Sequence, residues 1–158
     1  MSKKTVQNSI VVMHELVLPN DTNVLGNILG GKVMHYMDIC AAMSAYKHAR
    51  SPVVTASVDR LNFLTPAKMG DILILKSSIN YTGNTSMEVG VRIETEDPLT
   101  GEINHTASGY LTFVSLDDER KPKSVPAIKP ETEDEKRRFK QAQKRKEIRK
   151  TRLKEIAK

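Results

Sequence analysis

The chain has 158 residues, of which 39% are hydrophobic and only 4% aromatic, and it contains no tryptophan. This length suits one domain with an aliphatic core and an appendage. The single cysteine, Cys40, excludes an internal disulfide, and no apolar run approaches the ~20 residues that a membrane helix needs. We therefore expect a cytoplasmic protein.

The net charge of +6 is distributed unevenly along the chain. Residues 120–158 contain 16 Lys and Arg against 6 Asp and Glu, whereas residues 1–119 contain 9 and 13. The basic segment has one aromatic residue, Phe139, and so offers no platform on which bases could stack. We interpret this tail as a solvated helix and do not expect nucleic acid as a partner.

The predicted elements begin with a strand over residues 10–18, which ends at Pro19. A polar turn over 20–23 follows, and then a helix runs from Gly30 to about Ala49. Four strands come next, and the short turns between them make them antiparallel neighbours. These strands span residues 53–64, 72–81, 85–96 and 105–116.

The apolar pattern of these elements predicts how they pack. Residues 85–96 alternate between apolar and polar side chains, so one face of that strand is dry. An open sheet must bury its apolar face, and the long helix is hydrophobic nearly all round. The sequence therefore predicts an α+β fold, in which an antiparallel sheet of about five strands wraps around one central helix. A proline-rich linker then leads to a charged helix over 131–158.

Asp38 lies in the middle of the apolar helix, within the run 30–43. An unpaired carboxylate in such a place is costly. A chain tolerates that cost most readily where the carboxylate does chemistry. The alternative is a structural Asp that is held by backbone donors or by a partner across an interface.

Other catalytic patterns are missing from the sequence. The four histidines have no zinc-site spacing, and there is no GxSxG motif. Gly26, Gly30 and Gly31 match neither GxGxxG nor a phosphate-binding loop with its lysine. Cys40 lies on the apolar helix and is interpreted as a small core residue. We expect no metal and no redox cofactor.

Five separated motifs, all in one order, resemble a known family. They are Pro19–Asn23, Gly30–Asp38, Val54–Asp59, Phe63–Pro66 and Thr85–Val89. These motifs resemble the acyl-CoA thioesterases of the hotdog fold, most closely the bacterial and brain-type long-chain acyl-CoA hydrolases. The resemblance implies a hotdog domain over residues 8–126, followed by a charged helical tail over 127–158 to which it does not extend.

The resemblance also implies which residues form the site. The family builds its active site at a dimer interface and often assembles as trimers of dimers. One subunit would supply Asp38 as general base or nucleophile, and the facing subunit would supply Asn23. CoA would be held by two short segments, one made of Ala56, Ser57 and Val58 and the other of Thr85, Ser86 and Met87.

The predicted function is hydrolysis of fatty acyl-CoA to a fatty acid and CoA, without a cofactor. This chemistry needs a base, a donor to the oxyanion and a site that excludes bulk water. The N–H groups at the helix start, around Gly31, can reach the thioester oxygen, and Ser57 is expected to hydrogen-bond near Asp38. Three cations are candidates for the CoA phosphates: Arg60, Lys68 and Arg92.

Two alternatives stay open at this point. The first is a non-catalytic hotdog module that senses acyl-CoA and uses its basic tail to bind nucleic acid or another acidic partner. The second is a hotdog dehydratase or hydratase, which generally pairs a catalytic His with an acid on the helix. Here His35 lacks the matching context.

Overall fold

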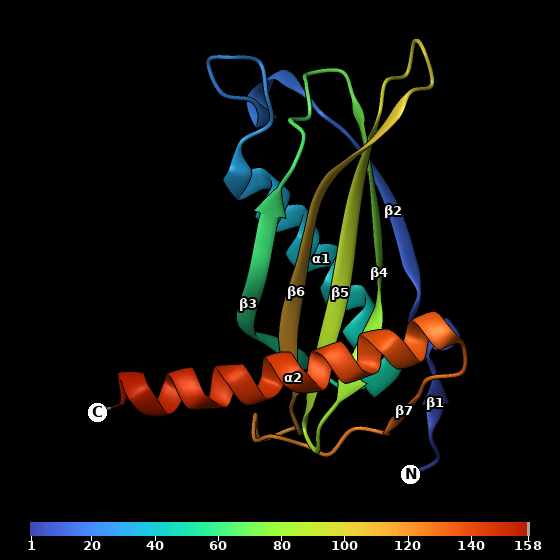
Figure 1. Ribbon diagram of the computed structural model, residues 1–158, viewed down its shortest axis with the longest axis vertical. Coiled ribbons are helices and arrows are strands. Elements are labelled where there is room, and N and C mark those ends of the chain that lie inside the picture. The colour runs from blue at the N-terminus through green and yellow to red at the C-terminus, as the bar shows by residue number, and fades with distance from the viewer. Residues whose placement is uncertain (158) are drawn as a thin grey trace.

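The computed structural model describes residues 1–157. A curved sheet wraps around the helix α1, and a second helix, α2, crosses the opposite face of the sheet (Figure 1). The helices are α1 (Gly30–Ala49) and α2 (Glu133–Ile156). The strands of the sheet are β2 (Val11–Leu16), β3 (Val53–Phe63), β4 (Ile72–Thr82), β5 (Ser86–Glu96) and β6 (Ile103–Ser115).

The five strands are ordered β2-β4-β5-β6-β3, and every neighbouring pair is antiparallel. Short turns join β4 to β5 and β5 to β6, as predicted. The prediction was wrong for β3, which pairs with β6 at the edge of the sheet and not with β4, the next strand along the chain. The predicted arrangement of about five strands around one long helix is confirmed. The core lies between the sheet and α1, and its largest fully buried side chains include Phe113, Met37 and Leu75.

The ends of α1 follow from the local sequence. Leu29 precedes the helix without a side-chain cap, so the first N–H groups of α1 have no capping partner from that residue. At the other end, Arg50 adopts a left-handed conformation with φ 52°, and Pro52 follows. The predicted helix bounds, Gly30 to about Ala49, are therefore confirmed.

A β-bulge in β3 changes which face its side chains occupy. Thr55 pairs with Phe113 and Ser57 pairs with Thr112, so Ala56 is an extra residue. Directly paired residues share a face of the sheet, and consecutive residues of β6 lie on opposite faces. Thr55 therefore faces α1, whereas Ser57 faces α2.

The helix α2 is packed on the sheet rather than solvated on all sides, so that expectation was wrong. Ala142, in the middle of α2, is only 1% exposed. Arg145 forms an ion pair with the buried Glu88 of β5, and Phe139 contacts Tyr81 of β4 edge to face. The sequence pattern did not indicate this packing face because much of the face is polar. In the described part of the chain, its buried charge, Arg145, is paired only by a residue of the sheet.

Four short elements were not predicted. The strands β1 (Lys4–Thr5) and β7 (Ile128–Lys129) form a parallel pair. Two 3₁₀ helices, η1 (Val6–Ser9) and η2 (Pro19–Asp21), flank β2. Elements of two to four residues are too short to show a periodic pattern. None of the helices within residues 1–157 combines the length and the apolar character that crossing a membrane requires.

Candidate active site

Asp38 lies on α1 at the edge of a cavity between the helix and β3. The cavity has a volume of about 310 Å³. Its lining is mostly apolar: Met34, Met37, Val58, Leu61 and Leu111, together with His35, Asp38 and Thr55. A carboxylate beside an apolar cavity of this kind can act on a group that enters the cavity and is shielded from bulk water there.

Within a single chain Asp38 is partly exposed, although its place in an apolar run suggested a buried carboxylate. The buried face of α1 passes through Met37 and Ala41, so Asp38 lies at its boundary. The surface around Asp38 is nevertheless apolar, because several large side chains are exposed beside it. These side chains are Met34, Ile39, Met43, Val54 and Val58, each between 37% and 46% exposed. A surface of this composition is typical of a contact with another chain.

Thr55 holds the carboxylate of Asp38 in place. Its Oγ1 donates a hydrogen bond of 2.6 Å to Oδ1 of Asp38. Ser57 was expected to hydrogen-bond near Asp38, and that expectation was wrong. The bulge at Ala56 turns Ser57 to the other face of the sheet, where its hydroxyl is buried and, among the described residues, has no hydrogen-bond partner.

Asn23 lies in an exposed loop before α1, and the loop fixes its side chain. Its Oδ1 accepts hydrogen bonds from the N–H groups of Leu25 and Asn27, at 3.0 and 3.2 Å. Gly26 closes this turn with φ 78°, a conformation that favours glycine. Since Oδ1 is engaged by the loop, the amide Nδ2 is the group that Asn23 can offer to another molecule.

Gly31 is the second residue of α1 and is exposed. A Cβ at this position would meet no atom within 4 Å, so the space around it is open. The adjacent Gly30 faces Phe63 of β3, as close packing of the helix on a strand requires. Gly31 precedes Asp38 by seven residues, about 10 Å along the helix axis. The structure therefore does not bring the helix start and Asp38 together within one chain.

The two predicted CoA segments lie at the same level of the sheet. Ser57 pairs with Thr112 of β6 and Met87 pairs with the next residue, Phe113, so the segments are separated by that single strand. Val58 lines the cavity beside Asp38, whereas the side chain of Met87 is fully buried. Met87 can therefore contact a ligand only through its backbone.

Cys40 is a core residue, as predicted. It is fully buried, and its Sγ donates a hydrogen bond to Ser77 Oγ at 3.3 Å. Burial raises the pKa of the thiol, which keeps it protonated and poorly nucleophilic. Within residues 1–157, no three or more His, Cys, Asp and Glu side chains gather closely enough to hold a metal ion.

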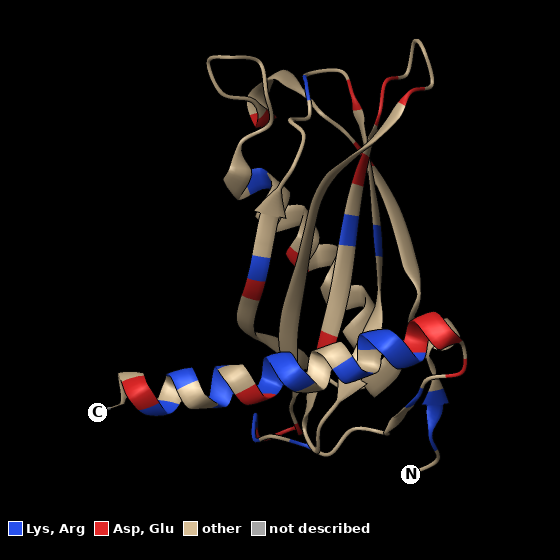
Figure 2. Ribbon diagram, in the orientation of Figure 1, with Lys and Arg blue, Asp and Glu red and all other residues tan. Residues whose placement is uncertain are grey.

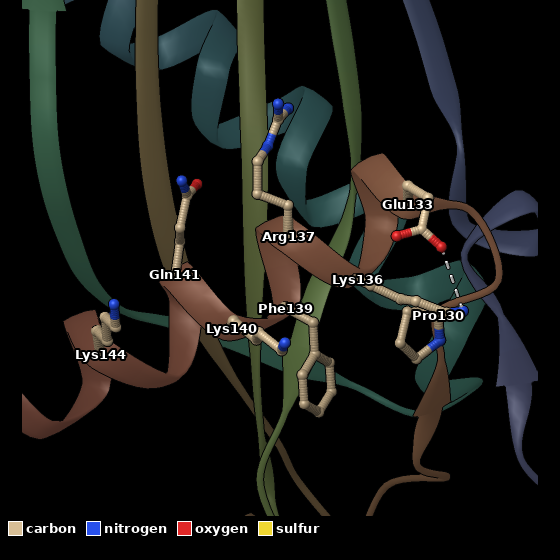
Figure 3. A pocket seen from close by; sticks show the side chains of 8 residues that line it. All are labelled: Pro130, Glu133, Lys136, Arg137, Phe139, Lys140, Gln141 and Lys144. Atoms are coloured by element: carbon tan, nitrogen blue, oxygen red, sulfur yellow. Dashed lines mark ion pairs between the residues drawn. The ribbon is translucent and has the colours of Figure 1, made fainter.

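A larger cavity, of about 500 Å³, lies along α2 and not at Asp38 (Figure 3). Its only carboxylate, Glu133, forms an ion pair with Lys136 at 3.6 Å. Most of the other lining side chains are exposed and polar or positively charged. None of them is a carboxylate that could act as a general base beside an apolar cavity. This cavity therefore lacks the chemistry that the smaller cavity at Asp38 provides.

A sheet wrapped around an apolar helix, with a carboxylate of that helix beside a cavity, defines an enzyme class with the hotdog architecture. Residues 25–102 match the family model described as the thioesterase superfamily. An uncharacterized acyl-CoA thioester hydrolase of Bacillus subtilis is 43% identical over 129 residues, which cover 82% of this chain and 75% of that protein. The chain belongs to the thioesterase superfamily, and within it to the acyl-CoA thioester hydrolases.

Solved structures agree with this family. A hexameric acyl-CoA thioesterase without ligand is 48% identical and has a TM-score of 0.93, over 97% of this chain and 98% of that one. The acyl-CoA hydrolase of Staphylococcus aureus, in complex with butyryl-CoA, CoA and CoA disulfide, is 42% identical with a TM-score of 0.91, over 98% and 94%. Variants of that enzyme with one Asp, one Asn or one Thr replaced by Ala have also been solved.

Proposed function

We propose that this protein hydrolyses the thioester of fatty acyl-CoA to a free fatty acid and CoA, with Asp38 as the group that activates water. The observation that carries the proposal is the apolar cavity of about 310 Å³ at the carboxylate of Asp38, which Thr55 orients. In this reaction the water oxygen attacks the carbonyl carbon while Asp38 takes a proton. The C–S bond then breaks, and the CoA sulfur leaves and receives the proton.

The donors to the oxyanion would come from a facing subunit. Asn23 and Gly31 are both exposed, Asn23 in the loop before α1 and Gly31 in its first turn, which lies about 10 Å along the helix axis from Asp38 of the same chain. A second copy that covers the apolar surface around Asp38 would bring these donors to the cavity and exclude water from it. The hexameric state of one solved relative supports assembly of this kind, with trimers of dimers as the expected form.

Two routes fit this arrangement. Asp38 can act as a general base on water, or its carboxylate can attack the carbonyl directly and form a mixed anhydride that water then hydrolyses. In both routes the acyl chain lies in the apolar cavity and CoA follows the segments 56–58 and 85–87. The choice of fatty acyl chains as substrate rests on the apolar lining beside Asp38.

The test is release of free thiol from a panel of acyl-CoAs of different chain length. Asp38→Ala is expected to lower kcat by about 10²- to 10⁴-fold, as removal of a general base does. Asn23→Ala is expected to lower it by about 10²- to 10³-fold, as loss of an oxyanion donor does. An Asp38→Ala variant that folds, assembles and cleaves at the full rate would show that Asp38 is not the base.

A mixing experiment tests whether the site is shared. If each site takes Asp38 from one subunit and Asn23 from the other, a mixed dimer of the two inactive variants contains one intact site. Random mixing of equal amounts then restores about one quarter of the wild-type activity. If both residues came from one chain, mixing would restore nothing.

The alternative to hydrolysis is a module that senses acyl-CoA without cleaving it. It predicts tight acyl-CoA binding without thiol release, so the same panel decides between the two. The cytoplasmic location also stays a prediction.

A further inference from the structure

A second cavity, on the α2 side of β3, is surrounded by four arginines. It has a volume of about 70 Å³ and lies between β3 and the C-terminal half of α2. Figure 2 shows that β3 carries a basic segment beside an acidic one, just above the largely basic helix. The cavity is lined by Asp59 and Arg60 of β3 and by Arg145, Ile148, Arg149 and Arg152 of α2.

Two of the four arginines are neutralised within the chain. Arg145 donates two hydrogen bonds to Glu88, at 2.7 and 3.1 Å, and Arg149 donates one to Asp59 at 2.7 Å. These contacts fix both guanidinium groups at the cavity wall. Since a guanidinium carries five N–H donors, each retains donors that its carboxylate does not use.

The other two arginines, Arg60 and Arg152, are exposed, and the described residues provide no ion-pair partner for either. Four guanidinium groups therefore face two carboxylates, which leaves an excess of two positive charges around a small cavity. Arg60 also has φ 49° at a β-bulge, a costly conformation for a residue other than glycine. An anion in the cavity would relieve the repulsion among these cations.

The helix next to the cavity is under the same positive field. Burial first, and then repulsion from Lys150 and Arg149, lower the pKa of Lys146. A group with two negative charges would complement this field. Planar guanidinium groups bind a phosphoryl group through paired N–H donors, which makes phosphate a better match than a single carboxylate.

We propose that this four-arginine cavity binds a terminal phosphoryl dianion. If the protein acts on acyl-CoA, as proposed above, the source is the 3′-phosphate of CoA, because a small cavity suits a terminal monoester better than the internal diphosphate. Val58 lines the proposed catalytic cavity and Asp59 lines this one, so the two cavities share β3 but lie on its opposite faces. Among the three candidate cations, this argument selects Arg60.

The experiment measures binding without turnover, by titrating the full-length protein with CoA and with 3′-dephospho-CoA in a calorimeter. The wild type is expected to bind CoA about 10- to 100-fold more tightly, the range expected for charged hydrogen bonds. The double variant Arg60→Gln/Arg152→Gln is expected to bind both ligands equally. If the double variant does not fold, Arg152→Gln alone replaces it. This single variant is expected to bind CoA about 10-fold more weakly than the wild type and to bind 3′-dephospho-CoA equally well. Arg137→Gln, on the same helix but outside the cavity, is the matched control and should keep the wild-type preference.

A second arm uses inorganic phosphate as the probe and follows the melting temperature. If the wild type binds CoA and dephospho-CoA equally, but is stabilised by phosphate only when Arg60 and Arg152 are present, the cavity takes its phosphoryl group from another molecule. If neither CoA preference nor phosphate binding depends on these arginines, the proposal is overturned. Neither readout requires thioester cleavage, so failure of this proposal is distinct from failure of the hydrolase.

Discussion

The ion pair between Arg145 and Glu88 is expected to fasten α2 to the sheet. The carboxylate of Glu88 is only 4% exposed, and it accepts two hydrogen bonds from Arg145 and one from Asn80. The guanidinium of Arg145 also stacks on the ring of Tyr110 at 3.6 Å. Arg145→Met removes the charge partner but keeps an apolar side chain over that ring.

Arg145→Met is expected to lower the free energy of unfolding by about 3–5 kcal/mol, because it leaves a buried carboxylate without its cation. For a chain of this length that corresponds to a fall of about 6–20 °C in Tm. The assay is urea unfolding followed by circular dichroism, at one fixed protein concentration, since an oligomer's stability depends on concentration. The double variant Glu88→Gln/Arg145→Met removes both charges, and it should regain more than half of the loss.

The matched control is Arg137→Met on the same helix. Arg137 pairs with Asp134 at 3.4 Å, and both side chains are more than half exposed. Exposed pairs contribute about 0–1 kcal/mol, so the control should be nearly neutral. A loss below about 1 kcal/mol for Arg145→Met, or a double variant no more stable than the single one, would refute the reasoning.

Three further predictions concern single residues. Thr55→Val removes the donor to Asp38 and should lower kcat by about 10-fold, whereas Thr55→Ser keeps it; equal rates for both variants would contradict the positioning role. Burial lowers the pKa of His48, although its hydrogen bond to Pro126 O partly opposes this. The unfolded state therefore binds the proton more tightly, and the contribution of His48 to stability is lost as the pH falls below about 6.5. As the pH is lowered from 8 to 5, the urea midpoint of His48→Gln should decrease less steeply than that of the wild type. An equal dependence on pH in both proteins would contradict this prediction. Cys40 should resist iodoacetamide in the native protein at pH 7.5 and react only in urea, as mass spectrometry would show; rapid native labelling would contradict its burial.

Much of the fold could be predicted because its signals are local. The alternation in residues 85–96 gives a strand with one buried face, and Met87, Val89, Val91 and Ile93 are indeed buried. The helix α1 is bounded by glycines at one end and by Pro52 at the other. The candidate base, Asp38, was found because a charge within an apolar run is itself a local anomaly.

The parts that could not be predicted depend on contacts between residues far apart in sequence. One extra residue, Ala56, decides that Thr55 rather than Ser57 contacts Asp38, and no pattern in 53–64 marks it. The partial exposure of Asp38 depends on how α1 rotates against the sheet.

The sequence by itself determined the two long helices, the five strands of the main sheet, their order along the chain and the family, because periodicity, turns and motifs are local features of the chain. Only the tertiary structure decided that α2 covers the sheet and that four arginines meet at one cavity. These outcomes depend on pairs such as Glu88 with Arg145, which are 57 residues apart. Such pairs form only when the sheet has already fixed one partner, so no local sequence pattern predicts them.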